Sequence, residues 1–191
     1  VSTASTIIHS GLNIVFVDVD LHSVCIDPNK IEEKITQKTL AVMPVDLAGN
    51  MADYSTICDL LRNYPDIYIL QDSAEALGAK LNDGTKAGMS GDVSFFSFHA
   101  TKLINCGQGG AALFKDDKLA NWLKKIAHHG IDTAKTGKYY WSDELGMNYS
   151  WTDFQAALAW SQLLEVEKLT QHRKEIFFYY SSNLTRTEDF E

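Results

Sequence analysis

The sequence predicts an α/β fold in which a mainly parallel sheet is flanked by helices. Two observations favour this class: five short apolar runs are rich in β-branched and aromatic residues, and helical patterns lie between several of them. Strands that alternate with helices favour parallel crossovers, because a parallel pair needs a long connection. A chain of 191 residues with 45% hydrophobic residues is long and apolar enough for one domain with a substantial core.

The predicted strands are the apolar runs themselves. Short continuous runs of this kind, bounded by polar residues, are typical of strands that are buried on both faces. The five runs are 14–19 (IVFVDV), 40–47 (LAVMPVDL), 67–71 (IYILQ), 93–98 (VSFFSF) and 111–114 (AALF).

Helical patterns occupy 29–36, 53–63 and 117–128, and Gly130 is a plausible C-cap for the last of them. Residues 1–11 read as the middle of a helix, and the chain begins with Val, so we expect a piece of a longer protein. Residues 130–147 show neither helical nor strand periodicity and are predicted to form a loop.

From about Thr152 to about Leu184 the helical pattern continues without Pro or Gly, which is long for a globular helix. We therefore expect residues 1–151 to be the central part of a large α/β domain. Residues 152–191 are expected to form a long helix that leads toward a smaller C-terminal domain.

Charge and cysteine content indicate which classes of partner are disfavoured and in which cellular compartment the protein is expected. The formal charge is -8 and no Lys/Arg-rich run is present, which argues against nucleic acid or an anionic membrane as the main partner. The three cysteines are widely separated, so reduced thiols are the simpler interpretation. No apolar stretch approaches the roughly 18 residues of a spanning helix, and no leader pattern opens the chain. We expect a cytoplasmic protein.

Polar residues that follow two of the predicted strands are the first candidates for chemistry. In an open α/β sheet, ligands bind beyond the carboxyl ends of the strands. Asp72 follows the run 67–71, and Lys102 follows the run 93–98 after His99 and Thr101.

A lysine in a partly dry pocket favours the neutral amine, which can condense with an aldehyde. A carboxylate across the pocket can hold a pyridine nitrogen, and the Ser97 hydroxyl can bind a phosphate. Most lysines are solvated loop residues, however, and many aspartates only cap turns. Neither Lys102 nor Asp72 is decisive alone.

Two other patterns are weaker. The segment GQGG at 107–110 lacks the spacing of both the dinucleotide-binding and the P-loop fingerprints, so a tight turn into the next strand is preferred over a nucleotide site. The adjacent His128 and His129 lack the spacing that places two imidazoles on one helix face, and no metal site is predicted.

The strings around Asp72 and Lys102 resemble the DegT/StrS-type aminotransferases, fold-type I enzymes that use pyridoxal phosphate (PLP). The family pattern is E-D-x-A-Q/E, then G-D-x-x-x-F-S-F-H-x-x-K, then G-E-G-G. In this chain Gln71 replaces the glutamate that opens the first motif, and Gln108 replaces the glutamate of the third motif. The resemblance continues through FVDVD at 16–20, IDP at 26–28, MPVDLAGNMAD at 43–53, HHG at 128–130 and GMNYSWTDFQAALAWSQL at 146–163.

The resemblance implies a fold, a cofactor and a set of roles. The fold would be the large domain of the PLP-dependent transferases, similar to aspartate aminotransferase. Lys102 occupies the Schiff-base position, Asp72 the position of the ring-nitrogen partner and Ser97 that of a phosphate ligand. Glu75 stands where the family has a residue beside the ring. Asn148 matches an asparagine that reaches the phosphate of the other subunit's cofactor, which implies a homodimer with a shared active site.

The implied reaction is transfer of an amino group from an amino acid, with glutamate as the expected donor, to a keto carbon of a nucleotide-linked deoxy sugar. Related enzymes that are sugar dehydratases have histidine at the Schiff-base position, whereas Lys102 is present here. A truncated, inactive PLP-fold domain is the other alternative. The family's usual arginine is replaced by Ser150, and the family's upstream phosphate-binding turn and stacking aromatic would precede Val1.

Overall fold

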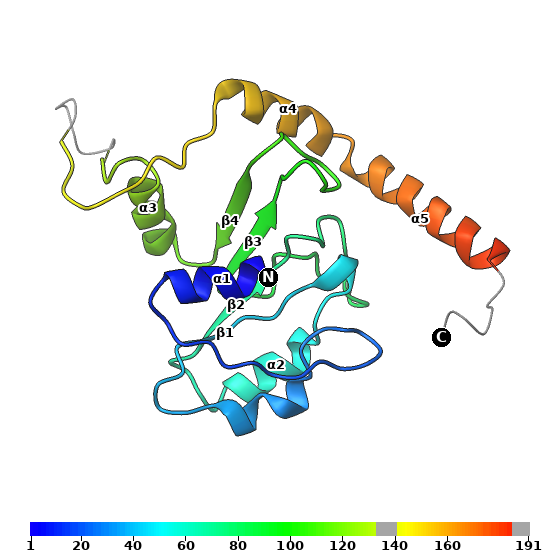
Figure 1. The fold of residues 1–191 in the computed structure, drawn as a ribbon, viewed down its shortest axis with the longest axis horizontal. Helices are drawn as coiled ribbons and strands as arrows, with labels where there is room; N and C mark the ends of the chain where they lie inside the picture. Colours follow the sequence, from blue (N-terminus) through cyan, green and yellow to red (C-terminus); the bar gives the residue numbers. More distant parts are fainter. Residues whose placement is uncertain (133–140, 185–191) are drawn as a thin grey trace.

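The computed structural model describes residues 1–132 and 141–184, and a four-stranded mixed sheet runs through its centre (Figure 1). The strands lie side by side in chain order, and β1, β2 and β3 are parallel whereas β4 is antiparallel to β3. The predicted α/β class with a mainly parallel sheet is confirmed. The strands are β1 (Ala41–Val42), β2 (Tyr68–Asp72), β3 (Val93–Ser97) and β4 (Gly110–Phe114).

The described residues also form five α-helices, and three of these begin at a side chain that caps the helix. Asp53 accepts a hydrogen bond from the backbone N–H of Thr56, Asp116 caps the third helix, and Thr152 forms a capping box with Gln155. Within the described residues no helix is long and apolar enough to span a membrane. The helices are α1 (Ser2–His9), α2 (Tyr54–Leu61), α3 (Asp117–Ile126), α4 (Asp153–Leu163) and α5 (Val166–Asn183).

The predicted strand at 14–19 is wrong. Only Val19 forms a bridge, to Ile26, and Phe16 is 74% exposed. A β-branched run becomes a strand only where a neighbouring strand accepts and donates its backbone hydrogen bonds, and no described strand lies beside residues 14–17.

The predicted helix at 29–36 is also wrong as a single element. Two 3-10 turns replace it, Pro28–Lys30 and Glu32–Lys34, and they are interrupted at Ile31. Ile31 is only 2% exposed and belongs to the core beneath β1 and β2. Eight residues are too few to make a stable helix by propensity alone, and the interruption lies where the buried Ile31 packs into the core.

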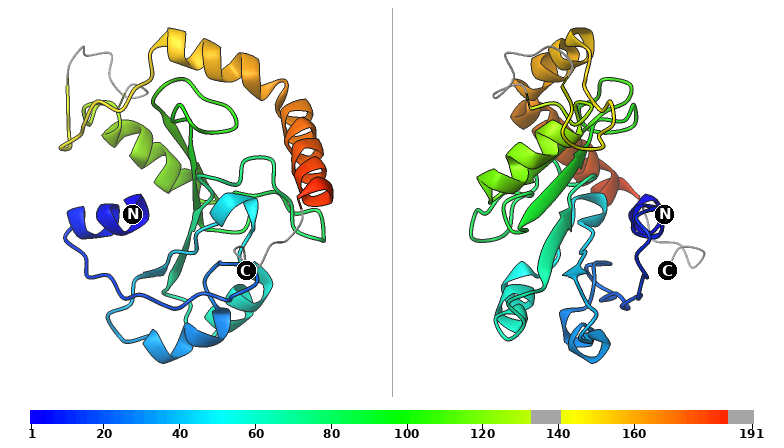
Figure 2. Two further views of the ribbon diagram at one scale, coloured as in Figure 1. Left: turned by 45° about the vertical axis from the view of Figure 1, so that its right-hand side comes forward. Right: turned by 90° about the vertical axis from the view of Figure 1, so that its left-hand side faces the viewer.

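The long helix predicted from Thr152 to Leu184 is divided in two. The chain turns at Leu164 and Glu165, and α4 and α5 point in different directions on either side of the turn (Figure 2). Contacts with different parts of the molecule hold the two halves. Gln162 of α4 exchanges hydrogen bonds with the backbone of Asn105, and Thr170 of α5 packs so closely on Gly78 that a Cβ there would lie 2.7 Å from its hydroxyl.

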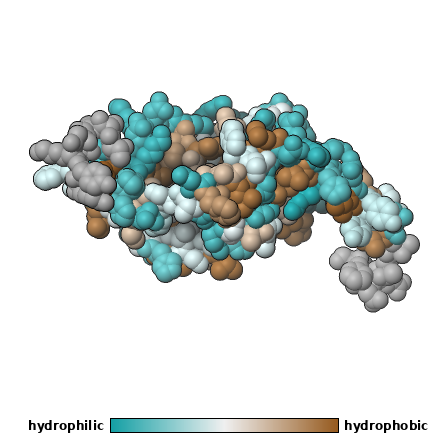
Figure 3. Space-filling model, turned by 90° about the horizontal axis from the view of Figure 1, so that it is seen from above, coloured by the Kyte–Doolittle hydropathy of each residue, from teal (hydrophilic) through white to brown (hydrophobic). Residues whose placement is uncertain are grey.

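Two clusters of buried hydrophobic residues pack helices against the sheet and its connections. One packs α2 against β1 and β2 through buried residues such as Ile57 and Ile69. The other places Phe98, Ile104 and Ala159 between α4 and the connection from β3 to β4. Apolar side chains remain visible among polar ones when the molecule is viewed from above (Figure 3). The second cluster matters most here, because that connection carries Lys102.

Candidate active site

The predicted site residues Asp72 and Ser97 lie at one edge of the sheet. Asp72 is the last residue of β2 and Ser97 is the last residue of β3, and the two strands are adjacent and parallel. Lys102 reaches this edge from the following loop, where its Nζ lies 3.1 Å from Oε1 of Glu75. An amine, two carboxylates and a hydroxyl therefore gather where ligands bind in open α/β sheets.

Glu75 is held from both sides. Its second oxygen, Oε2, accepts a hydrogen bond of 3.1 Å from the backbone N–H of Ala48. The hydrogen bond from Lys102, followed by that from Ala48, lowers the pKa of the Glu75 carboxyl below its ordinary value of 4.5. Ala48 has a left-handed backbone (φ 53°) next to Gly49, so the tight turn at Leu47–Gly49 aims this N–H at the site.

The Lys102 side chain is 22% exposed, which agrees with the expected partly dry surroundings. Lys102 and Glu75 form an ion pair in these surroundings. The Lys102 nitrogen therefore has to leave its contact with Glu75 Oε1 before it can bond to another group.

We predict that Glu75→Gln has a small, pH-dependent effect on the stability of the cofactor-free protein. The carboxyl has a lowered pKa in the folded state, so its contribution is present above its ordinary pKa of 4.5 and is lost as the pH falls through the lowered value. Because the side chain is 43% exposed, we expect less than about 1 kcal/mol at neutral pH. Urea unfolding of the wild type and of Glu75→Gln at neutral and acidic pH measures the difference in their free energies of unfolding. A difference that is larger at acidic pH would contradict the prediction.

Asp72 is oriented by a residue that sequence reasoning did not identify. Thr3 in α1 donates its hydroxyl to Oδ2 of Asp72 at 2.7 Å, and the backbone N–H of Ala74 donates to Oδ1 at 3.2 Å. The two residues are separated by 69 positions, and one threonine in a helix carries no pattern that marks it. Its hydroxyl fixes the rotation of the carboxylate, whose remaining lone pairs can still accept a hydrogen bond.

Ser97 and the residues after it form a compact turn that leads to Lys102. Ser97 Oγ accepts from the backbone N–H of His99 at 3.2 Å, which leaves the hydroxyl hydrogen for an acceptor such as phosphate. His99 O in turn accepts from the backbone N–H of Lys102 at 2.9 Å. The loop returns through Gly107, whose φ of 83° makes the turn that precedes β4, so the interpretation of GQGG as a turn is confirmed.

Asn148 lies on a different segment of the chain. It forms a bridge with His128, and its Oδ1 accepts from the backbone N–H of Ser150 at 3.3 Å. His128 Nδ1 lies 3.3 Å from Ser150 Oγ, where the family has arginine. The structure does not join Asn148 to the Asp72–Lys102 cluster by any contact within the described residues. The loop predicted for 130–147 falls partly on 133–140, which lie outside those residues.

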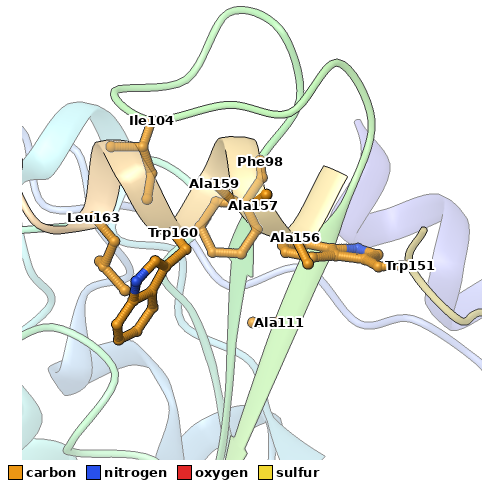
Figure 4. Close-up of a pocket in the computed structure, with 9 residues that line it drawn as sticks. All are labelled: Phe98, Ile104, Ala111, Trp151, Ala156, Ala157, Ala159, Trp160 and Leu163. Atoms are coloured by element: carbon orange, nitrogen blue, oxygen red, sulfur yellow. The ribbon is translucent and has the colours of Figure 1, made fainter. Parts of the chain in front are cut away.

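An apolar pocket of about 560 Å³ lies between α4 and the strands β3 and β4 (Figure 4). Trp160 and Leu163 project toward it from α4, and Phe98 and Trp151 lie across from them. Phe98 and Trp151 pack edge to face at 5.2 Å. None of the lining residues is charged, and the lining shares no residue with the group formed by Asp72, Glu75, Ser97 and Lys102. Its lining is completed by Ile104, Ala111, Ala156, Ala157 and Ala159.

Comparisons with known proteins identify the family of this chain. The profile of the DegT/DnrJ/EryC1/StrS aminotransferase family matches residues 1–191. A GDP-perosamine synthase of Caulobacter vibrioides is 33% identical over 186 residues, which cover 97% of this chain and 49% of that protein.

Two solved structures have the same fold. The aminotransferase PseC of Helicobacter pylori, involved in the biosynthesis of pseudoaminic acid, superposes with a TM-score of 0.91 at 29% identity, covering 98% of this chain and 49% of that one. The putative sugar aminotransferase Spr1654 of Streptococcus pneumoniae, in its PLP form, superposes with a TM-score of 0.85 at 28% identity, covering 98% and 54%.

The predicted fold of the large domain of PLP-dependent transferases is thereby confirmed. The chain spans about half the length of the relatives that it matches. The family match extends over the whole chain, including the segments that carry Asp72, Lys102 and Asn148. This chain therefore belongs to the DegT/DnrJ/EryC1/StrS aminotransferase family.

Proposed function

We propose that this chain forms the PLP-binding core of an enzyme that transfers an amino group from glutamate to a keto carbon of a nucleotide-linked deoxy sugar. The observation that carries the proposal is the placement of Lys102 beside Glu75, at the sheet edge where Asp72 ends β2. Membership in a family with sugar aminotransferases among its named members supports the class of substrate.

The residues at this edge suit the chemical groups of PLP. The Lys102 amine matches the aldehyde, the Asp72 carboxylate matches the protonated ring nitrogen, and the Ser97 hydroxyl matches the phosphate. Bound PLP supplies an electron sink that stabilises negative charge at the substrate carbon. Glu75 lies beside the amine and holds it while it is charged.

Lys102 has two tasks in this mechanism. Its amine would hold the aldehyde of the cofactor, and once released it would act as the general base that moves a proton at the substrate carbon. Asp72 would hold the proton on the ring nitrogen. Thr3 keeps the Asp72 carboxylate in one orientation through its 2.7 Å hydrogen bond.

Two alternatives are separated by simple observations. A sugar dehydratase of this family would have histidine at position 102, and the lysine favours amino transfer. A truncated domain without turnover is the second alternative, and mass spectrometry of the native chain distinguishes it, because further residues at either end favour the complete enzyme. The cytoplasmic location and the lack of nucleic-acid or membrane partners stay predictions.

The direct test supplies the native protein with PLP, isotopically labelled glutamate and a panel of nucleotide-linked keto sugars. We expect the label to appear in an amino sugar nucleotide, detected by mass spectrometry. Loss of oxygen from the sugar without uptake of nitrogen would instead indicate the dehydratase. If PLP binds and neither product forms with any sugar, the proposed activity is wrong.

We further propose that the enzyme is a homodimer and that Asn148 of one subunit completes the active site of the other. Lys102→Ala and Asn148→Ala should each be inactive alone. When the two variants are mixed and allowed to exchange subunits, each mixed dimer regains one intact site, so about a quarter of the wild-type activity should return. No recovery in a sample shown to contain mixed dimers would place Asn148 in its own subunit's site or outside both.

A further inference from the structure

A buried carboxylate lies directly behind Asp72. Asp46 is 0% exposed, and no part of the proposed chemistry uses it. Each of its two oxygens accepts two hydrogen bonds, as the burial of a charge requires. The donors to Oδ1 are Ala52 N (3.1 Å) and Tyr54 Oη (2.8 Å), and the donors to Oδ2 are Gln71 Nε2 (2.8 Å) and Ser73 Oγ (2.7 Å).

Two of these donors flank Asp72 in the chain. Gln71 and Ser73 are both 0% exposed, whereas Asp72 between them is partly exposed on the opposite face, as the alternation of a strand demands. Asp46 therefore binds the side chains on both sides of Asp72. Its backbone N–H also donates to Asp72 O at 2.9 Å.

The side-chain amide of Gln71 donates a hydrogen bond through its nitrogen and accepts hydrogen bonds through its oxygen. Its Nε2 donates to Asp46, whereas its Oε1 accepts from the backbone N–H groups of Ser90 (3.0 Å) and Gly91 (3.1 Å) and from Ser94 Oγ (3.2 Å). Position 71 is one of the two places where this chain has glutamine instead of the family's glutamate. A glutamate there would set two buried carboxylates at hydrogen-bonding distance.

We propose that the Asp46 carboxylate and the Gln71 amide form a hydrogen-bonded pair that positions Asp72 for the cofactor's ring nitrogen. One member of the pair is a carboxylate and the other is a neutral amide. Tyr54 and Ser73 donate further hydrogen bonds to the carboxylate. Burial, followed by the nearby Asp46 carboxylate, raises the pKa of Tyr54, which keeps this phenol a donor. The positioning role rests on the proposed function of Asp72.

The exchange of the two groups tests this pairing. In Asp46→Asn one amide oxygen replaces two carboxylate oxygens that accept four hydrogen bonds, so the new amide nitrogen faces either Gln71 Nε2 or the backbone N–H of Ala52. In Gln71→Glu two carboxylates face each other. The double variant places the amide at position 46 and the carboxylate at position 71, so the new amide nitrogen can donate to the new carboxylate. The Ser73 hydroxyl then has to turn and accept from that nitrogen, and the net charge is unchanged. Gln171→Glu, on the exposed surface of α5, is the matched control for the added charge.

Three measurements are made on each protein: the melting temperature without cofactor, the pH titration of the visible absorbance with PLP, and kcat and KM. We expect each single variant to melt roughly 5 °C or more below the wild type. Each should also shift the midpoint of the absorbance titration and lower kcat about tenfold with little change in KM. The double variant should recover on all three measurements.

If the single variants do not fold, Tyr54→Phe and Ser73→Ala each remove one of the four donors and provide milder tests. A shifted titration midpoint in either supports the positioning role, and unchanged midpoints in both overturn it. If the double variant has a melting temperature, titration midpoint and kcat no closer to those of the wild type than the worse single variant, the proposed pairing is wrong. Absence of any PLP signal in the wild type contradicts the proposed function instead, and the melting temperatures of the cofactor-free proteins still decide the pairing.

Discussion

Lys102→Ala should lower amino transfer by at least roughly 10⁴-fold, equivalent to about 5.5 kcal/mol of barrier. The variant loses both the covalent anchor for the cofactor and the general base that moves the proton. Some PLP should still bind without a covalent bond, because Asp72 and Ser97 remain. Labelled amino transfer measures the loss, and borohydride reduction followed by peptide mapping should place the pyridoxyl group on Lys102 in the wild type and nowhere in the variant.

Lys124→Ala is a suitable control for this substitution, because Lys124 lies exposed on α3. It should retain the activity and the label of the wild type. Lys102→Arg keeps the positive charge beside Glu75 and should be as inactive as the alanine variant, since a guanidinium does not condense with the aldehyde. Activity like that of the wild type in Lys102→Ala would remove the basis for the assigned chemistry.

Asp72→Asn should lower turnover by roughly 10³-fold, or about 4 kcal/mol, while PLP still becomes attached to Lys102. The amide has nearly the same shape, and its oxygen can accept from Thr3, but it carries no charge to keep the ring nitrogen protonated. The visible spectrum and borohydride labelling report attachment, and single-turnover kinetics report the proton transfer.

Asp59→Asn on the exposed surface of α2 removes one carboxylate elsewhere and serves as the control. Asp59 forms a surface ion pair with Arg62, and such exposed pairs contribute little to stability. Thr3→Val should cause a smaller loss of turnover than Asp72→Asn, since the carboxylate keeps its charge and the hydrogen bond from Ala74 N. If Asp72→Asn retains full turnover, another group must protonate the ring.

Much of the candidate site was predictable from sequence because its residues occupy ordered positions along the chain. Asp72 follows the apolar run 67–71 and Ser97 is the last but one residue of the run 93–98; these runs form β2 and β3, and Lys102 follows the second run in a short turn. Parallel pairing of adjacent strands brings such ends together without any further information. The cofactor, the dimer and the roles of these residues stay proposals.

Predictions failed where a partner distant in sequence decides the structure. The run at 14–19 has strand propensity and lacks a described neighbour. The helical pattern from 152 onward does not show that Gln162 and Thr170 are held by different parts of the molecule, on either side of the turn at Leu164 and Glu165. Propensity describes a residue and its near neighbours, whereas these outcomes depend on contacts across the fold.

By itself, the sequence determined the α/β class, the apolar runs 67–71 and 93–98 that form β2 and β3 to within one residue at each end, and the position of the lysine, because burial periodicity is a local property. Only the tertiary structure showed that Thr3 orients Asp72 from 69 residues away and that Asp46 binds the side chains on both sides of it. Hydrogen bonds between such positions form only after the sheet has brought distant segments within about 3 Å of each other, and no sequence spacing encodes that distance.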